Sequence, residues 1–518
     1  MTNVRHPAAL DVILLAVATA LTRFALRSHY LYDIDSVNFA LALKRFDTAV
    51  HQPHPPGYFL YILLGRALHP IFRDANTALV AISIIFSCGA VAMIYVLAGN
   101  WFGRAPAVFA GAIFVFSPLA WFHGTVALTY IVECFFSALT GYLCWRIYSG
   151  AARFALPAAV VVGIAAGFRP SSLLLLGPLF LFSVRKAGLR QAMLAVGMLL
   201  LTLLAWFVPM IRMSGGSSAY FSSLVSLWRA VPSKGMLFNS SVLNSVARGV
   251  LIALIYFLCF GCAAILPMLR DRGTTSLNRG KTIFTWIWMA PGLLFFTFIY
   301  LKFVNSGYLL ALAPPICAWM GLWASHWYSD RRLSGARKIL LTAGCAAVNS
   351  AIFIAAPVYC SYGEVRRFET ELREITAAVP LIAPSRDTMI VGFDSHFLGY
   401  RHAGYYLPGY LTIQFPEVQL GAGRRIFAME QRDTWLESGL DTTSIRHFIL
   451  FPLPLGDKEY SEYMARVYKR FPAGALHRVT QGGREYAIGS VADLRFLFSD
   501  SVSSARAHVD ESRLQPRP

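Results

Sequence analysis

Two acidic residues and a histidine stand out in a stretch of the sequence that is otherwise largely apolar. Asp33 and Asp35 lie one residue apart in "YDIDSVNF", and His54 follows in "QPHPPGY". A carboxylate beside a lipid bilayer is costly unless water solvates it or the protein uses it, so such an acid is a candidate for function. Carboxylates of this kind serve as general bases or bind cations. In the alternative interpretation, Asp35 only caps a helix, Asp33 is only solvated, and the prolines after His54 only fix the backbone.

The composition indicates a membrane protein. Of the 518 residues, 56% are hydrophobic and 14% are charged, and several apolar runs approach the roughly 20 residues that a helix needs to cross a bilayer. The net charge of +19 comes entirely from residues 1–360, because residues 361–518 carry 19 basic and 19 acidic side chains. This asymmetry is typical of cytoplasmic anchoring and of phosphate attraction in a membrane domain, and not of nucleic-acid binding. The eight cysteines show neither a disulfide framework nor zinc-site spacing.

Eleven apolar segments are predicted to cross the membrane: 8–26, 77–99, 105–122, 128–147, 155–168, 171–184, 190–211, 249–269, 283–301, 307–327 and 338–358. Every second connection between them is rich in arginine and lysine, which places the N-terminus in the cytoplasm. Residues 57–72 are apolar but short, and Arg66, His69 and Pro70 interrupt them. A span here would put all five basic connections outside, so we predict an interfacial or re-entrant helix. The first loop, 27–57, then lies outside.

The pattern predicts two kinds of structure outside the membrane. Phe39, Leu43 and Phe46 recur at helical spacing, which predicts an amphipathic helix lying on the membrane surface. After residue 360, "EVRRFETELREITAAV" is predicted to be a polar linking helix. Short strands are predicted for "TMIVGF", "YLTIQF", "RHFILF" and "YAIGSV", with the helix "EYSEYMARVYKRF" between the last two, so residues 361–498 are predicted to form a small external α/β domain. Residues 499–518 are predicted to be disordered. The expected fold class is therefore a mainly α, polytopic membrane domain over residues 1–360, in the inner (plasma) membrane, with a periplasmic or otherwise extracytoplasmic C-terminal domain.

The stretch "YDIDSVNFALALKRFDTAVHQPHPPGYFLY" resembles the first external loop of the GT-C superfamily of membrane glycosyltransferases. The resemblance is greatest to glycosyltransferase family 39 and the protein O-mannosyltransferases, including the lipid A aminoarabinose transferase. Those proteins have an acidic motif soon after the first span and an HPP-like motif before the next helices. Further stretches agree in order: "SPLAWFHGTVALTYIVECFFSAL", "AAGFRPSSLLLLGPLFLF", "NSGYLLALAPPICAW" and "YRHAGYYLPGY". The resemblance covers nearly all of residues 1–360 and implies a GT-C fold.

The resemblance also implies an inverting transfer of a sugar from a polyprenyl-phosphate-linked donor to an acceptor on the outer face of the membrane. Asp33 and Asp35 match the acidic motif, and one of them would activate or orient the acceptor. Asp33 is favoured because Asp35 is then left to cap the helix. His54 matches the HPP histidine and would donate to the phosphate or orient the acidic loop. Many relatives have adjacent Asp and Glu where this chain has Asp-Ile-Asp, so the choice between the two acids stays open. A divalent cation between them is a further option that no other cluster supports.

A second set of residues is expected to bind substrate or phosphate: His123, Tyr130, Glu133, Arg169, Lys302 and Tyr308. Glu133 is the only acid where relatives often have a second one, and its alternative role is that of a buried structural glutamate. Arg169, between two short predicted helices, has the planar fork that suits phosphate, and its alternative is an arginine that snorkels to the interface. Lys302, beside Tyr308, is a second candidate cation with the same alternative.

Two other classes of function compete with the glycosyltransferase. A flippase or transporter of lipid-linked sugars would be expected to show inverted repeats and ionisable groups near mid-membrane, and the sequence shows neither. A non-catalytic relative that serves as an assembly subunit is the third interpretation. No "GxxxxGK" phosphate loop is present, which argues against nucleotide hydrolysis. Arg401 and His402 of the outer domain are further residues that we place, as an expectation, near the site.

Overall fold

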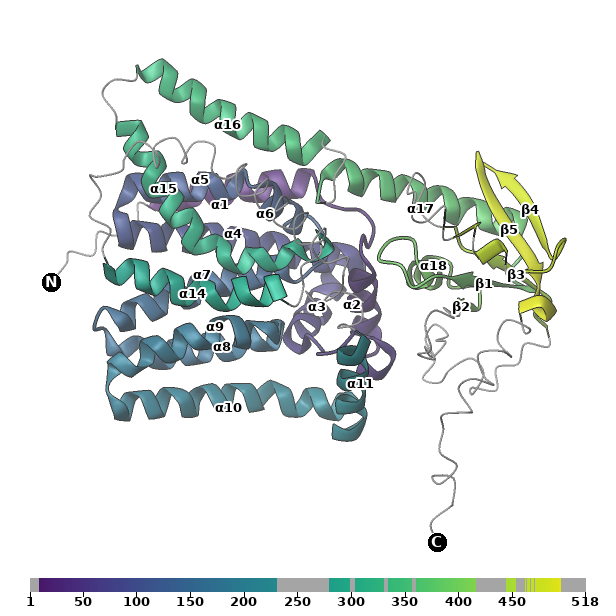
Figure 1. Ribbon diagram of the computed structural model, residues 1–518, viewed down its shortest axis with the longest axis horizontal. Helices are drawn as coiled ribbons and strands as arrows, with labels where there is room; N and C mark the ends of the chain where they lie inside the picture. The colour runs from purple at the N-terminus through teal and green to yellow at the C-terminus, as the bar shows by residue number, and fades with distance from the viewer. Residues whose placement is uncertain are drawn as a thin grey trace, which may run out of the picture. The chain divides into compact units, whose positions relative to one another are not determined.

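The chain forms two compact units, each described by itself here (Figure 1). Unit 1 comprises Met1–Tyr30 and Ala42–Arg366, and unit 2 comprises Leu31–Leu41 and Arg367–Pro518. The structure is a computed structural model, and it describes residues 9–230, 279–298, 303–329, 334–355, 360–415, 444–452, 462, 464–465, 467–469 and 471–494.

Unit 1 is an assembly of helices, most of which run side by side in Figure 1. Helix α4 packs against α1, α5 and α7, helix α8 against α7, α9 and α10, and helix α15 against α5. The helices are α1 (Ala9–Ala25), α3 (Phe59–Phe72), α4 (Ala75–Phe102), α5 (Arg104–Val115), α6 (Pro118–His123), α7 (Tyr130–Tyr148), α8 (Ala155–Phe168), α9 (Ser171–Val184), α10 (Leu189–Met213), α11 (Ser217–Ala230), α14 (Arg279–Phe298), α15 (Ala313–Ser329) and α16 (Gly335–Ala355). Short 3-10 helices are η1 (Thr48–Val50), η2 (Ala152–Phe154), η3 (Arg185–Ala187) and η4 (Phe303–Leu312).

Several helices of unit 1 have the length and composition of membrane spans. Among the described residues, four helical stretches are long and apolar enough to cross a bilayer: Ala75–Phe102, Leu189–Met213, Ser306–Ser329 and Gly335–Ala355. Large apolar side chains remain exposed along two of them, such as Leu201 at 63% and Leu340 at 71%, and such a surface suits lipid. The chain is thus an integral membrane protein. The count of eleven spans and the orientation stay predictions, and the predicted span 249–269 lies outside the described residues.

The ends of several helices follow from local sequence signals. Helices α8 and α9 have the bounds predicted from the sequence, because Pro170 disfavours helical backbone at the residue before it. The continuous span predicted over 105–122 is wrong, since α5 ends at Val115 and α6 starts at Pro118. The Ser117 hydroxyl accepts the Ala120 N–H at 3.2 Å, and proline at the first helical position completes this N-terminal cap.

Polar side chains join helices within unit 1, and two such contacts involve α1. The Asp11 carboxylate accepts both a bidentate contact from Arg104, at 2.7 and 2.9 Å, and the hydroxyl hydrogen of Tyr95 at 2.8 Å. These bonds connect α1, α4 and α5. The fully buried Arg23 of α1 donates to the carbonyl oxygen of Val115 at 2.7 Å. The C-terminal end of a helix attracts positive charge, so an arginine at this point of an apolar helix stabilises the adjacent end of α5.

Helix α2 (Ile34–Lys44) contributes residues to both units, because the division falls between Leu41 and Ala42. The amphipathic surface helix predicted here is wrong, since residues 36–43 are all buried, including the polar Asn38 at 3% exposure. Its last turn is capped from α3: the Arg66 guanidinium donates to the carbonyl oxygens of Leu43 and Ala42, at 3.0 and 2.8 Å. This contact explains why an arginine interrupts the apolar segment 57–72.

Unit 2 contains a five-stranded mixed sheet in the order β2-β1-β3-β5-β4. Strand β1 pairs in parallel with β2 and β3, and β5 pairs in antiparallel fashion with β3 and β4. The strands are β1 (Thr388–Gly392), β2 (Thr412–Gln414), β3 (His447–Leu450), β4 (Leu476–Gln481) and β5 (Arg484–Ser490), and the helices are α18 (Tyr400–Tyr406) and the residues of α17 (Tyr362–Ile382) from Arg367 onward.

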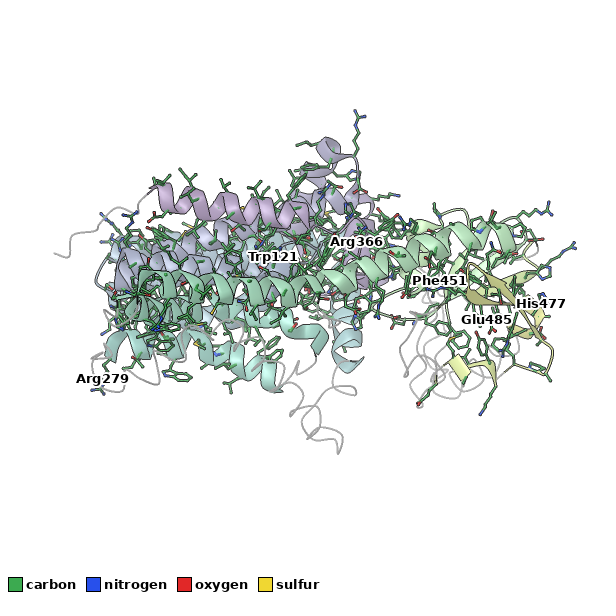
Figure 2. The ribbon with its side chains drawn as sticks, turned by 90° about the horizontal axis from the view of Figure 1, so that it is seen from above. Trp121, Arg279, Arg366, Phe451, His477 and Glu485 are labelled. Carbon is green, nitrogen blue, oxygen red and sulfur yellow. The ribbon has the colours of Figure 1, made fainter. Side chains whose placement is uncertain are left out.

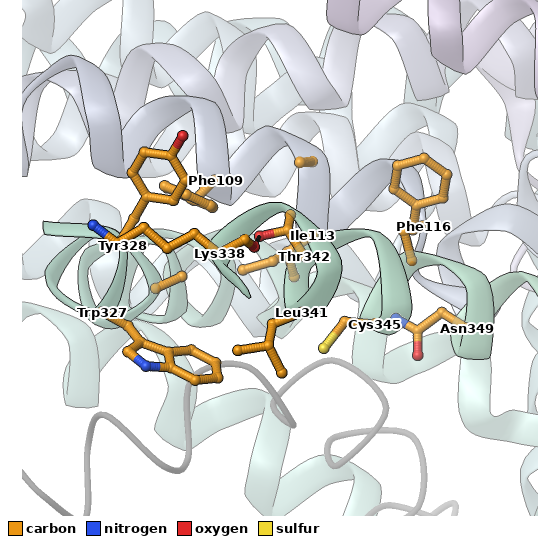
Figure 3. A pocket seen from close by; sticks show the side chains of 13 residues that line it. Phe109, Ile113, Phe116, Trp327, Tyr328, Lys338, Leu341, Thr342, Cys345 and Asn349 are labelled. Atoms are coloured by element: carbon orange, nitrogen blue, oxygen red, sulfur yellow. Dashed lines mark hydrogen bonds between the residues drawn. The ribbon is translucent and has the colours of Figure 1, made fainter. Parts of the chain in front are cut away.

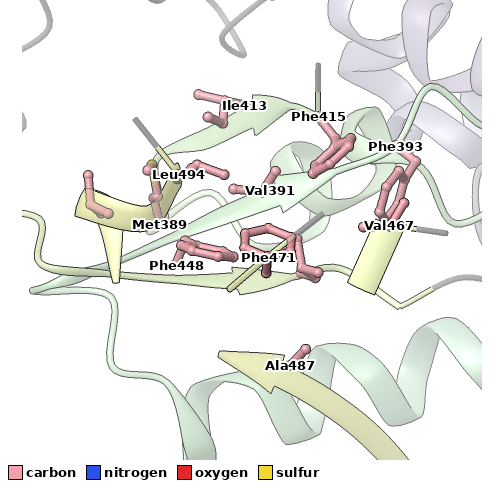
Figure 4. Close-up of a cluster of buried hydrophobic side chains, with 12 residues drawn as sticks. Met389, Val391, Phe393, Ile413, Phe415, Phe448, Val467, Phe471, Ala487 and Leu494 are labelled. Carbon is pink, nitrogen blue, oxygen red and sulfur yellow. The ribbon is translucent and has the colours of Figure 1, made fainter. Parts of the chain in front are cut away.

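One hydrophobic cluster of unit 2 lies on one face of this sheet (Figure 4). Met389 and Val391 of β1, Ile413 of β2 and Phe448 of β3 are each at most 1% exposed and pack together there, with Phe471 stacked on Phe448 at 5.7 Å between ring centroids. On α17, Glu371 forms a buried ion pair of 3.2 Å with Arg484 of β5. The exposed side chains of His477 and Glu485 belong to the hairpin β4–β5, as Figure 2 shows.

Candidate functional site

The acidic segment, residues 31–41, is bound by backbone contacts within unit 2. The Leu31 N–H donates to the hydroxyl oxygen of Tyr406 at 2.8 Å, and the Ile34 N–H donates to the carbonyl oxygen of His396 at 2.9 Å. Tyr406 ends helix α18, and His396 lies in the loop that follows β1. The α/β domain therefore fixes the backbone on both sides of Asp33.

Asp33 is the more buried of the two acids, and its side chain caps α2. It is 3% exposed, and its Oδ1 atom accepts the N–H of Asp35 at 2.9 Å. Its Oδ2 atom lies 3.9 Å from Nδ1 of His396. The sequence predicted that Asp35 caps the helix, and this is wrong because the cap is made by Asp33, the residue directly before the first turn. Asp33 therefore combines a capping role with a carboxylate oxygen turned toward an imidazole.

The protein environment raises the pKa of the Asp33 carboxyl group to about 7. Burial is the largest cause, and the negative charge of Asp35 adds to it. His396 and the backbone hydrogen bond from Asp35 act in the opposite direction. A carboxyl group with a pKa near neutrality can take up a proton from a hydroxyl group in a reaction at physiological pH, which is what a general base requires.

His54 occupies a constrained loop of unit 1, directly before α3. Its Nε2 atom lies 3.1 Å from the Tyr58 hydroxyl, and the two rings are 4.8 Å apart. Between them Gly57 adopts φ +113°, and a Cβ atom there would lie 2.6 Å from the sulfur of Met210. Only glycine adopts this backbone without strain, so the "HPPGY" sequence fixes the position of Tyr58 relative to His54.

Arg169 and Glu133 form a buried ion pair where three helix ends of unit 1 meet. Nε of Arg169 lies 3.0 Å from Oε2 of Glu133, and the two residues are 3% and 1% exposed. The hydroxyl groups of Ser171 and Ser172 donate to Oε1 of Glu133 at 3.1 and 3.0 Å, and Thr129 accepts from Nη1 of Arg169. Because Arg169 is buried and paired, the alternative of a snorkelling arginine is wrong.

Three tyrosine rings surround the Arg169 guanidinium group. Its central carbon lies 4.0 Å from the ring centroid of Tyr130, 4.4 Å from that of Tyr308 and 5.8 Å from that of Tyr58. His123 packs on Tyr130 at 4.8 Å between ring centroids. Aromatic faces attract a guanidinium group and replace the water that it loses on burial, so they hold it in one orientation.

Two groups of this cluster have unused hydrogen-bonding capacity. Among the described residues, no hydrogen bond is made by Nη2 of Arg169, although Nε and Nη1 are both engaged. His123 is fully buried, and neither of its ring nitrogens has a hydrogen-bond partner in the part of the chain that the structure describes. An arginine with a free donor, held by a carboxylate and three aromatic rings, is suited to bind one oxygen of an anionic group.

The structure groups most of the residues expected to bind substrate. His123, Tyr130, Glu133, Arg169 and Tyr308 form one cluster of unit 1, and Tyr58 connects it to His54. Lys302 lies outside the described residues. Asp33 and Asp35 belong to unit 2. Arg401 and His402 are buried inside unit 2, where Arg401 donates to the Tyr400 hydroxyl at 2.9 Å and burial lowers the pKa of His402 to about 4, so they serve its core.

Sequence reasoning missed several residues of these sites: Tyr58, Thr129, Ser171, Ser172 and His396. Their signals were present in part. Tyr58 belongs to "HPPGY" and the two serines directly follow "FRP", so all three lie within four residues of His54 or Arg169 in the sequence. His396 had no such signal, because only the pairing of distant segments places it beside Asp33.

The acid pair offers few protein ligands for a metal ion in the described part of the chain. No group of three or more His, Cys, Asp or Glu side chains suited to a metal ion occurs among the described residues. One oxygen of Asp33 is used by the backbone of Asp35. Two carboxylates, one of them partly engaged, could hold a divalent cation such as Mg²⁺ only if water or substrate oxygens completed its coordination.

A separate hollow lies between α5, α15 and α16 in unit 1 (Figure 3). Its walls are mainly apolar, with Phe109, Ile113 and Leu341 among them, and Lys338 lies over the ring of Tyr328 at 5.4 Å. None of the described candidate residues lines this hollow, so it is distinct from the Arg169 cluster.

Comparison with known families gives a match over part of the chain. Residues 45–191 match the family model of the protein O-mannosyl-transferase TMEM260 N-terminal domain. That range includes His54, His123, Tyr130, Glu133 and Arg169. No curated protein matches the chain by sequence.

Comparison with solved structures gives matches over most of the chain. The crystal structure of ArnT from Cupriavidus metallidurans bound to undecaprenyl phosphate matches with a TM-score of 0.56 and 12% sequence identity, over 93% of this chain and 98% of that chain. The apo state of the same protein matches with a TM-score of 0.54 and 12% identity, over 93% and 97%. The Archaeoglobus fulgidus oligosaccharyltransferase tethered with an acceptor peptide gives a TM-score of 0.43 at 12% identity, over 92% and 74%.

The two ArnT structures confirm the resemblance seen in the sequence at the level of fold. The chain therefore has the GT-C fold of ArnT, and its residues 45–191 match the N-terminal domain of a protein O-mannosyl-transferase family.

Proposed function

We propose that this protein transfers a sugar from a polyprenyl-phosphate-linked donor to an acceptor hydroxyl group on the outer face of the membrane. The observation that carries the proposal is the buried Asp33 carboxyl group with a pKa raised to about 7, in a chain with the fold of a protein that binds undecaprenyl phosphate. The match of residues 45–191 to an O-mannosyl-transferase family favours mannose as the sugar and a protein hydroxyl as the acceptor.

The reaction assigns one role to each site. The acceptor oxygen attacks the anomeric carbon of the donor from the face opposite the phosphate, and its proton passes to Asp33. The bond between the anomeric carbon and the phosphate oxygen breaks, and polyprenyl phosphate leaves. Inversion at the anomeric carbon follows from this single displacement. Asp33 is preferred to Asp35 as the base because Asp33 is buried and has the raised pKa.

Arg169 is the group that we assign to the leaving phosphate. Its guanidinium remains charged at all relevant pH values, and its Nη2 atom has no hydrogen bond among the described residues. Glu133 orients it and balances its charge, while Tyr130 and Tyr308 exclude water from its faces. A fixed cation that meets the charge developing on the phosphate lowers the barrier without reorganisation. His54 acts through Tyr58, to which it is hydrogen-bonded.

The test is sugar transfer by purified protein in lipid vesicles, with polyprenyl-phosphate mannose and a set of hydroxyl-bearing peptides. We expect Asp33→Asn to lower the transfer rate by about 100-fold or more, because general bases contribute about 10² to 10⁴. Arg169→Lys keeps the charge and loses the planar fork, so a loss of about 10-fold or more is expected. Glu485→Gln neutralises an exposed acid and Arg185→Lys exchanges an exposed arginine for lysine, so these two variants are the controls.

Two outcomes would contradict the proposal. Transfer that is unchanged in Asp33→Asn and Asp35→Asn would exclude the carboxylate mechanism. No transfer by the parent protein, with mannose or with a panel of other polyprenyl-phosphate sugars, would favour the assembly-subunit interpretation. Movement of an intact fluorescent lipid-linked sugar between leaflets, without transfer, would favour the flippase interpretation.

A further inference from the structure

The loop after β1 lies at the switch point of the unit 2 sheet. Strand β1 lies between β2 and β3, and both neighbours run parallel to it. The chain passes from β1 to β2 on one side and reaches β3 on the other side. Open α/β sheets bind their ligands at the carboxyl ends of the strands at such a point. Here the loop of residues 393–399 occupies that place, and the acidic segment is bound to it.

Aromatic packing adds to the backbone contacts that hold the acidic segment. The ring of Tyr32 lies 5.2 Å from that of Phe368 on α17 and 4.9 Å from that of Phe397 in the β1 loop. Tyr32 is 3% exposed, and Phe368 is 6% exposed. With the bond from Ile34 to the carbonyl of His396, this packing fixes the residues on both sides of Asp33.

His396 is the residue of this loop that faces the Asp33 side chain. Its Nδ1 atom lies 3.9 Å from Oδ2 of Asp33, while Oδ1 of the same carboxylate is bound to the N–H of Asp35. The first separation is that of an ion pair and the second is that of a hydrogen bond, so the two oxygens of the carboxylate have different partners. The His396 side chain is 57% exposed, whereas the Asp33 side chain is 5% exposed, so the imidazole lies between the buried carboxylate and solvent.

The charged groups around Asp33 act in opposite directions. Asp35 is negative and favours the protonated form of Asp33, whereas a protonated His396 favours the ionised form. His402, buried beneath Leu31 and Tyr32, is kept neutral because burial lowers its pKa to about 4. Of the groups that influence Asp33, His396 is therefore the one that opposes both burial and Asp35 with a positive charge.

We propose that His396 is a positioning residue, supplied by the α/β domain, that holds the Asp33 carboxylate in its reactive orientation and favours its ionised form. This inference rests on the proposed function, because it assigns the part of the chain that prepares the base for transfer. In this proposal the α/β domain takes part in the reaction through the effect of His396 on the Asp33 carboxylate.

The first experiment measures the pH profile of transfer. Removing His396 removes a positive partner from Asp33, so its pKa rises, and the acidic limb of the profile should move to higher pH by about one unit in His396→Ala. His396→Lys supplies a permanent positive charge and should move the limb back to or below its original position. His477→Ala changes an exposed histidine on β4, the edge strand at the opposite end of the sheet order from β2, and should leave the limb unchanged.

The second experiment needs no activity. Melting temperatures are measured for Asp33→Asn, His396→Ala and the double variant at pH 7, where the Asp33 carboxyl group, with its pKa of about 7, is substantially ionised in the folded protein. If the two side chains interact, the effects of the single changes should not add, whereas Asp33→Asn combined with His477→Ala should be additive. An interaction in the first pair and none in the second supports the contact.

The outcomes separate this inference from the proposed function. Additive melting temperatures for Asp33→Asn and His396→Ala would overturn the inference, whether or not the protein transfers sugar. A non-additive pair with an acidic limb that does not move in His396→Ala would overturn the effect on ionisation. A parent protein that transfers no sugar contradicts the proposed function, and with it the positioning role, while the non-additive melting temperatures would still show the contact.

Discussion

At the scale of single residues, the environment of Asp33 opposes the ionised carboxylate that the proposed reaction requires. An aspartate in water has a pKa near 3.8, and burial together with Asp35 raises that of Asp33 to about 7. A buried carboxylate that is disfavoured in its ionised form lowers the stability of the folded protein. Residues that lower stability in this way occur most often at functional sites. The buried, hydrogen-bonded position next to His396 therefore supports a role in chemistry for Asp33.

The raised pKa of Asp33 predicts how stability depends on pH. Below about pH 4 the carboxyl is protonated in both folded and unfolded chains, so it costs nothing. As the pH rises from 4 to 7, only the unfolded chain releases the proton, so the folded state loses stability, and the full loss is reached above pH 7. We expect Asp33→Asn to melt a few degrees higher than the parent at pH 8 and at nearly the same temperature at pH 4. A higher melting temperature at pH 4 but not at pH 8 would contradict this sign.

For the buried Glu133–Arg169 ion pair, we expect substitution of the acid to lower the melting temperature. Glu133→Gln leaves the Arg169 charge buried without a counter-charge, which costs about 3–5 kcal/mol in comparable pairs. We therefore expect a markedly lower melting temperature for Glu133→Gln. The double variant Glu133→Gln/Arg169→Gln removes both charges and should recover much of the loss.

The same double variant separates structure from function. It should remain inactive in sugar transfer, because the phosphate ligand is gone even though the fold is restored. Recovery of transfer in the double variant would show that Arg169 serves only to balance Glu133, and the assignment of Arg169 to the phosphate would then be wrong.

At the scale of elements, local sequence signals determined what could be predicted. Helices α8 and α9 were predicted with their observed bounds because a proline separates two apolar runs. The segments of β1, β2, β3 and β5 were recognisable as short apolar runs rich in β-branched and aromatic residues. Strand β4, "LHRVTQ", was missed because it is an edge strand with many exposed polar side chains.

The position of α2 could not be predicted from its own sequence. Its apolar residues have helical spacing, but the structure buries the polar face as well, including Asn38. Periodicity reports which residues prefer burial and not how many sides of a helix are covered. The same limit applies to His396, whose relation to Asp33 arises from contacts between segments more than 350 residues apart.

The contact between Arg23 of α1 and the last carbonyl group of α5 predicts how substitution of Arg23 changes the melting temperature. Arg23 donates to the carbonyl oxygen of Val115 at the end of α5, so Arg23→Met should leave that carbonyl unpaired in an apolar region. An unpaired buried polar group costs about 1–3 kcal/mol. We expect a lower melting temperature in detergent for Arg23→Met and a smaller change for Arg27→Met. In an exposed hydrogen bond, the guanidinium of Arg27 donates to a carbonyl oxygen of the preceding helix α1, that of Phe24, at 2.8 Å. Equal effects of the two substitutions would contradict the role given to Arg23.

At the scale of the whole molecule, the distribution of charge predicts orientation. The positively charged connections of residues 1–360 are expected in the cytoplasm, and the α/β domain is expected on the opposite side of the membrane. A cysteine placed at exposed His477 should then react with a membrane-impermeant maleimide in intact spheroplasts. A cysteine at exposed Arg185 should react only after the membrane is opened. The parent protein reports the background from its native cysteines, and the reverse labelling pattern would contradict the orientation.

Helix α2 has a consequence for how this molecule can be taken apart. Its first residues belong to one compact unit and its last three to the other. A chimera that exchanges only residues 367–518 for those of a relative would remove the residues that Leu31–Leu41 contacts in this protein. Residues 31–41 must therefore be exchanged together with the α/β domain in any such chimera. We also expect the sequence of the acidic segment and that of the α/β domain to vary together among homologues.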